Sequence, residues 1–91
     1  MLTALASLVN QLMSAFRGAE SASQNLVRVF GGTPTEARLR GFEWAVKTLQ
    51  DAGIEDASAT QVRAIRELRR HNRALSLLGA RALIDEVIAR S

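Results

Sequence analysis

The sequence lacks the side chains from which most catalytic and metal sites are made. It has no cysteine, no tyrosine and a single histidine among its 91 residues. Without cysteine neither a disulfide nor a thiolate metal site can form, and without a second histidine there is no histidine pair to hold a metal. Acid–base catalysis needs titratable groups that their surroundings can tune, and the one histidine, His71, stands among arginines. We therefore expect a protein that is not an enzyme and binds no cofactor.

Aromatic residues are also scarce, at 4% of the chain, and alanine and leucine dominate the apolar residues. Alanine and leucine favour helices, whereas strands favour β-branched and aromatic residues. A chain of 91 residues forms one domain with a small core. The composition predicts an all-α fold, a small bundle of three to four short helices, which a second copy or a partner would help to stabilise.

Capping residues and helical periodicity place the helices along the chain. Thr33, Pro34 and Glu36 have the pattern of a capped helix start. Gly53 is a typical helix stop. Ser58 and Gln61 have the spacing of a second capping box. The expected helices are 2–17, 19–30, 34–52, 59–72 and 76–90.

The first third of the chain leaves its organisation open. Gly18 interrupts the helical pattern, so residues 1–30 form either one helix or two. Residues 26–30 are also the one strand-like window. We favour a helix there, because an isolated strand has no partner to pair with.

The segment 1–16 is amphipathic but carries no charged side chain. It is too short and too polar to span a bilayer, and it lacks the basic start of a secretion signal. An uncharged polar face fits a helix in the middle of the bundle, a self-association face or, less well, a helix at a membrane surface. Tryptophan is also frequent at interfaces. The interface candidates are therefore Leu5, Val9, Leu12, Phe16 and Trp44.

Charge is concentrated in one short run, although the net charge is only +3. Residues 59–74 carry five arginines and one glutamate, whereas the acids Asp51, Glu55 and Asp56 precede them. The run is either a solvated helix face, a surface for an acidic protein partner such as another copy's acidic segment, or a nucleic-acid contact. The contact candidates are Arg63, Arg66, Arg69, Arg70 and Arg73.

These patterns favour a non-enzymatic helical interaction or assembly protein, either self-associating or a subunit of a larger complex. The expected partner is a second copy or a protein with an acidic surface. The alternative is a small nucleic-acid-binding protein that docks the arginine-rich helix 59–73, since arginine donates paired hydrogen bonds to phosphate. We expect a cytoplasmic location, because no segment has the pattern of a secretion signal or a membrane span.

Overall fold

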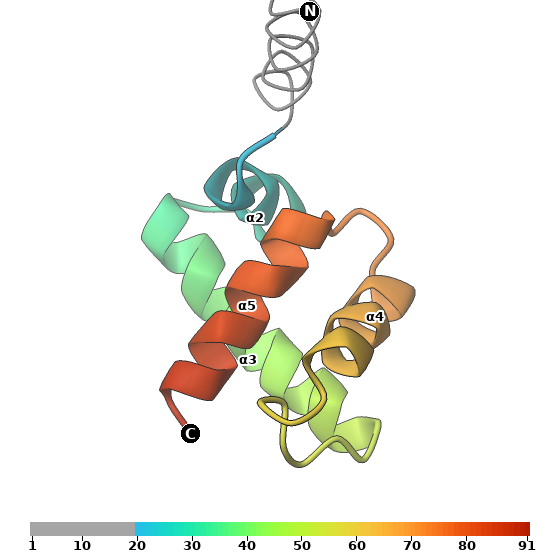
Figure 1. Ribbon diagram of the computed structural model, residues 1–91. Coiled ribbons are helices and arrows are strands. Elements are labelled where there is room, and N and C mark those ends of the chain that lie inside the picture. Colours follow the sequence, from blue (N-terminus) through green and yellow to red (C-terminus); the bar gives the residue numbers. More distant parts are fainter. Residues whose placement is uncertain (1–19) are drawn as a thin grey trace, which may run out of the picture.

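The computed structural model describes residues 20–91, which form four helices and no strand. The helices are α2 (Ala22–Phe30), α3 (Pro34–Asp51), α4 (Gln61–His71) and α5 (Leu77–Ala89). They make one compact bundle, shown in Figure 1. The predicted all-α fold is confirmed, and the strand-like window 26–30 is helical. The expected helix 2–17 lies outside the described residues.

α3 has the start and the stop that the sequence predicts. The Thr33 hydroxyl accepts a hydrogen bond from the Glu36 amide, and the Glu36 carboxylate accepts one from the Thr33 amide. At the other end Gly53 takes a positive φ of 74°, the left-handed conformation that favours glycine. The Gly53 and Ile54 amides donate to the carbonyls of Gln50 and Leu49 over 3.0 and 2.9 Å, which is a Schellman motif.

The other helices begin where their caps allow. α2 is capped by extended Ser21, whose hydroxyl accepts from the Gln24 amide, so α2 begins at Ala22 and not at the expected residue 19. α5 is capped by Ser76 and ends one residue before the expected position 90. The one-residue differences at α5 are within the usual uncertainty of helix ends.

The second capping box, predicted at Ser58, is wrong. The Ser58 and Ala59 amides both donate to the carboxylate of Asp56, which makes a turn. α4 therefore begins later, at Gln61, and its N-cap Thr60 makes no side-chain capping bond. The Thr60 hydroxyl instead donates back to the Asp56 carbonyl at 2.9 Å.

The helices pack as a central pair with two flanking helices. α3 and α5 contact each other, and α2 and α4 each pack on this pair rather than on one another (Figure 1). Alanines fill the contact positions, which lets the helix backbones approach closely. The buried apolar core comprises Leu26, Ala37, Ala45, Leu49, Ile54, Ala57, Ala64, Leu68, Leu75, Ala80, Leu83 and Ile84.

α4 turns a different face to the core than its apolar residues suggest. The sequence places Val62, Ile65 and Leu68 on one side, but the buried residues are Ala64 and Leu68. Ala64 and Leu68 lie about 40° apart around an ideal helix, whereas Val62 stands about 160° from Ala64. Val62 is consequently 72% exposed, and Ile65 is half-buried at the edge.

This orientation predicts a large loss of stability for one truncation on α4 and almost none for another. Leu68→Ala removes a fully buried side chain and should lower the free energy of unfolding by about 2–5 kcal/mol. Val62→Ala, at an exposed position, should change it by less than about 0.5 kcal/mol. Urea denaturation followed by circular dichroism measures both. Equal losses in the two variants would show that α4 is rotated from the orientation described.

Candidate interaction surface

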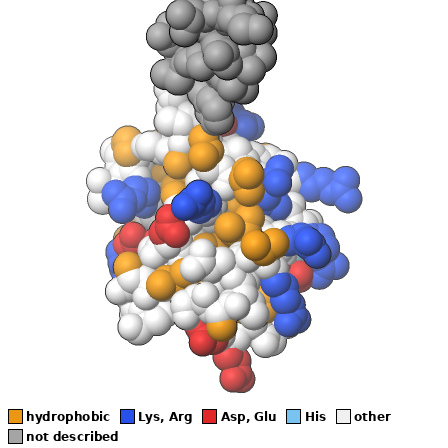
Figure 2. All heavy atoms as spheres, in the orientation of Figure 1, with side chains coloured by type: hydrophobic (Ala, Val, Ile, Leu, Met, Phe, Trp, Pro, Cys, Tyr) orange, Lys and Arg blue, Asp and Glu red, His pale blue; other side chains and the backbone are white. Residues whose placement is uncertain are grey.

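A solvent-open groove lies where α4 meets the start of α5. Its apolar floor consists of Val62, Ile65 and Leu77, and its volume is about 580 Å³. Leu77 is 56% exposed, so part of this floor faces solvent. Figure 2 shows cationic side chains gathered over the α4 side of the molecule, beside exposed hydrophobic ones. The remaining lining residues are Arg66, Arg69, Arg70 and Arg73.

The groove brings together four of the five arginines that the sequence singles out. α4 ends at His71, so Arg73 belongs to the following turn and not to a straight helical line. Arg63 is exposed but does not line the groove. The arginines thus flank an apolar floor on its α4 side, which the sequence alone does not indicate.

The arginines of the groove differ in how far their charge is matched. Arg70 pairs with Glu67 at 2.6 Å, and His71 Nε2 lies 3.2 Å from the same carboxylate. Arg69 Nε donates to the Leu75 carbonyl at 3.4 Å, a neutral acceptor. Among residues 20–91, Arg66 and Arg73 make no ion pair. The rim therefore keeps excess positive charge.

Glu67 offsets only one of these charges. Its hydrogen bond from Arg70 holds the pKa of the Glu67 carboxyl below its usual value, with His71 adding to the effect. The same bond raises the pKa of Arg70. Both groups are thus ionised at neutral pH. The Glu67 side chain is only 18% exposed and does not line the groove.

The apolar floor is the part of the site that sequence reasoning misses. Val62 and Leu77 are apolar and stand at helical spacing from other apolar residues, a pattern typical of a core face. Both are nevertheless more than half exposed. One local signal was present: Leu77 and Leu78 are adjacent at the start of α5, and adjacent positions stand about 100° apart on a helix. Both leucines are exposed, since the buried positions of α5 begin at Gly79.

The remaining interface candidates lie elsewhere. Trp44 is partly buried and packs on Phe30, with ring centroids 5.5 Å apart, so it contributes to the bundle itself. Leu5, Val9, Leu12 and Phe16 lie outside the described residues. A role for these side chains in an interface stays a prediction.

A second hollow of about 770 Å³ lies between α3, the 53–58 loop and the end of α5. The Arg90 guanidinium stands 4.5 Å from the Phe42 ring centroid at its edge. Of its two acids, Asp56 is engaged within the turn, because the Ser58 hydroxyl and the Ala59 and Ser58 amides donate to its carboxylate and lower its pKa. Among residues 20–91 no group of three His, Asp or Glu side chains is placed to hold a metal ion. We therefore take the arginine-lined groove as the candidate site.

A buried amide fixes the turn that carries two residues of the groove. Asn25 of α2 is fully buried. Its side-chain nitrogen donates to the Ala74 carbonyl at 3.1 Å, and its oxygen accepts from the Ser76 amide at 2.9 Å. These bonds hold the turn between α4 and α5, residues 72–76, which contains Arg73 and leads directly into Leu77. The side chain of Asn25 thereby positions both the rim and the floor of the groove.

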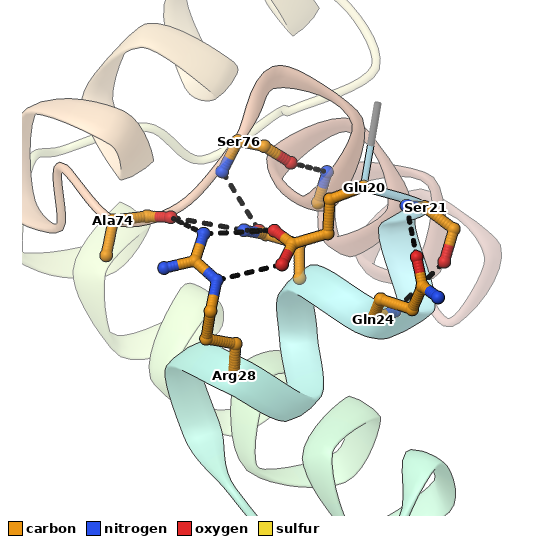
Figure 3. Close-up of polar contacts among 8 residues, drawn as sticks. Glu20, Ser21, Gln24, Arg28, Ala74 and Ser76 are labelled. Carbon is orange, nitrogen blue, oxygen red and sulfur yellow. Dashed lines mark hydrogen bonds and ion pairs between the residues drawn. The ribbon is translucent and has the colours of Figure 1, made fainter. Parts of the chain in front are cut away.

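Glu20 and Arg28 extend this hydrogen-bond network toward the protein surface. The Asn25 nitrogen also donates to Glu20 at 2.8 Å, and Arg28 donates twice to the same carboxylate at 2.8 and 2.9 Å. Figure 3 shows the carboxylate and the guanidinium meeting beside Ala74 and Ser76. The Arg28 and Asn25 bonds lower the pKa of Glu20 from 4.5 to about 2.

Gly79 leaves room for the Asn25 amide. A Cβ at position 79 would collide with Asn25 Oδ1, the atom that accepts from Ser76. In an open helix Gly→Ala stabilises by about 0.5–1 kcal/mol. Here we expect Gly79→Ala to destabilise by about 1–3 kcal/mol, because the amide cannot move without losing its partners.

A double-mutant cycle tests this cause. Asn25→Ala alone should cost about 1–3 kcal/mol for each buried group that it leaves unsatisfied. In the Asn25→Ala background, Gly79→Ala should become neutral or stabilising, since the collision is gone. Chemical denaturation of the four proteins gives the coupling. Additive losses would show that Gly79 and Asn25 do not interact.

The depressed pKa of Glu20 predicts a specific acid sensitivity. A carboxyl whose pKa is lower in the folded state stabilises the fold above its unfolded pKa. That contribution is lost as pH falls from about 4.5 toward 2. Glu20→Gln should therefore lose less stability than the wild type over this interval.

The matched control is Glu43→Gln, which removes an exposed carboxylate that has no ion pair within residues 20–91. Thermal unfolding at several pH values compares the three proteins. The idea fails if the Glu20→Gln and wild-type curves stay parallel below pH 4.5.

None of the helices formed by residues 20–91 has the length and apolar character of a membrane span. Comparison with protein-family models, curated proteins and solved structures finds no match for this chain. The arguments about function therefore rest on the groove and on the sequence.

Proposed function

We propose that this chain is a non-enzymatic interaction or assembly protein that binds a macromolecular partner through the arginine-lined groove. One observation carries the proposal: an exposed apolar floor flanked by arginines whose charge is largely unmatched. Arginine is favoured at protein interfaces and in charged recognition. A merely solvated arginine face does not need an apolar floor open to water, which costs solvation free energy.

A protein partner accounts for the groove better than a nucleic acid does. Phosphates would engage the arginines but leave Val62, Ile65 and Leu77 uncovered. No aromatic side chain lines the groove to stack on a base. The net charge of +3 is also small for a dedicated nucleic-acid binder.

Nucleic-acid binding remains the second candidate function, because four arginines share one rim. Contacts of this kind would be insensitive to base sequence and would weaken steeply with salt, since each neutralised phosphate releases counterions.

Self-association is one form of the proposal. Asp51 and Glu55 are exposed and lie in the acidic segment before α4. Their charge suits the arginine rim of another copy. The uncharged segment 1–16 supplies a further self-association surface by its sequence pattern.

Reversing the charge of the rim should abolish partner binding. We choose Arg66→Glu with Arg73→Glu, because neither side chain makes an ion pair within residues 20–91. The control, Lys47→Glu with Arg81→Glu, changes exposed positions outside the groove by the same charge. Sedimentation velocity gives the mass of each protein, alone and with a duplex DNA, at about 50 and 200 mM salt.

We expect the wild type and the control to form assemblies larger than the monomer, or to retain a partner protein on a column that carries the immobilised chain. The rim variant should do neither. DNA binding that collapses at the higher salt would favour the second candidate function. A clean monomer that binds no DNA and retains no protein would contradict both.

A further inference from the structure

We infer that the groove receives an acidic amphipathic helix of a partner protein, with aliphatic side chains along one stripe and Asp or Glu along the edge that faces α4. This rests on the proposed function and specifies the partner. The floor and the rim of the groove each define one part of this occupant.

The apolar floor is covered best by a convex apolar ridge on the partner. Val62 and Ile65 come from α4 and Leu77 from α5, so two helices bound one concavity. A helix about 10 Å wide presents such a ridge through apolar residues at spacings of three and four. Docking an amphipathic helix between two helices is a recurrent form of peptide recognition.

The rim requires carboxylates on the helix that docks. Arg66, Arg69 and Arg70 stand on α4, and Arg73 stands in the turn at its end. The planar guanidinium donates two parallel hydrogen bonds to a carboxylate. Exposed pairs of this kind add little affinity each, but together they select and orient an acidic partner.

Other occupants match only one of these two parts. The chain's own segment 1–16 has an apolar stripe but no charged residue, so it would leave the arginines unmatched. A nucleic acid matches the arginines but leaves the floor exposed to water.

The groove is held in shape before the partner binds. Ala64 and Leu68 anchor α4 on its other face, and the Asn25 side chain fixes the Ala74–Ser76 turn. A site held in this way loses little conformational entropy on binding. Seven residues form a small contact, so we expect micromolar affinity, typical of small transient interfaces.

The probe is a synthetic, hydrocarbon-stapled helix of about four turns, with leucines along one stripe, glutamates along one edge and a fluorescein label. One control peptide replaces the leucines by serine and keeps the charge. The other replaces the glutamates by glutamine and keeps the stripe. Fluorescence polarisation with the full chain measures affinity, and amide chemical shifts locate the contact.

We expect the acidic leucine helix to bind and to shift amides of α4 and the start of α5. Each control peptide should bind at least about tenfold more weakly. Val62→Ser with Leu77→Ser, at exposed floor positions, and Arg66→Glu with Arg73→Glu should each give a similar loss. Lys47→Glu with Arg81→Glu should bind normally. Unchanged circular dichroism shows that the variants are folded.

Equal binding of the serine peptide, or displacement of the probe by duplex DNA, would overturn the inference in favour of a polyanion. Floor-dependent binding to phosphatidylserine vesicles, without peptide binding, would overturn it in favour of a membrane surface. No binding of the acidic helix would also overturn it. In each case the mass and column experiments still decide the proposed function separately, because they do not use this peptide.

Discussion

The side-chain amide of Asn25 is the interaction on which the arrangement of this bundle depends. α2 and α4 do not pack on one another, yet Asn25 of α2 reaches the turn that ends α4 and begins α5. A buried polar group is tolerated only when its hydrogen bonds are made. In residues 20–91 no buried side-chain nitrogen or oxygen atom lacks a hydrogen-bond partner. The amide therefore specifies one position for the turn, which an alanine- and leucine-rich core alone would fix less strictly.

The groove is a consequence of how α4 is oriented. Small Ala64 lets α4 approach the bundle closely, and this places Val62 outward beside Leu77. Glu67 holds Arg70 in place, while the other arginines of the groove remain available for a partner. Packing thus creates the apolar floor, and the charge run in the sequence supplies the rim. Neither feature would make a selective site by itself.

Sequence reasoning succeeds where structure is decided locally. Thr33 and Glu36 cap a helix through residues three apart, and Gly53 ends it through its own φ, so neighbouring residues suffice to predict α3. It fails where distant packing decides. The partners of Asn25 in the turn between α4 and α5 are 49 and 51 residues away. The outward orientation of Val62 depends on Ala64 fitting the bundle. The arginines of the site were therefore predictable from their spacing, but its floor was not.

α4 is fastened to the bundle by a single large side chain, Leu68, with Ala64 beside it. Elements with so little buried area open at lower free energy than the whole domain unfolds. The site is thus carried by a helix whose place in the bundle depends strongly on Leu68. A ligand bound there would slow amide hydrogen exchange throughout α4, so occupancy of the groove and integrity of the fold are thermodynamically linked.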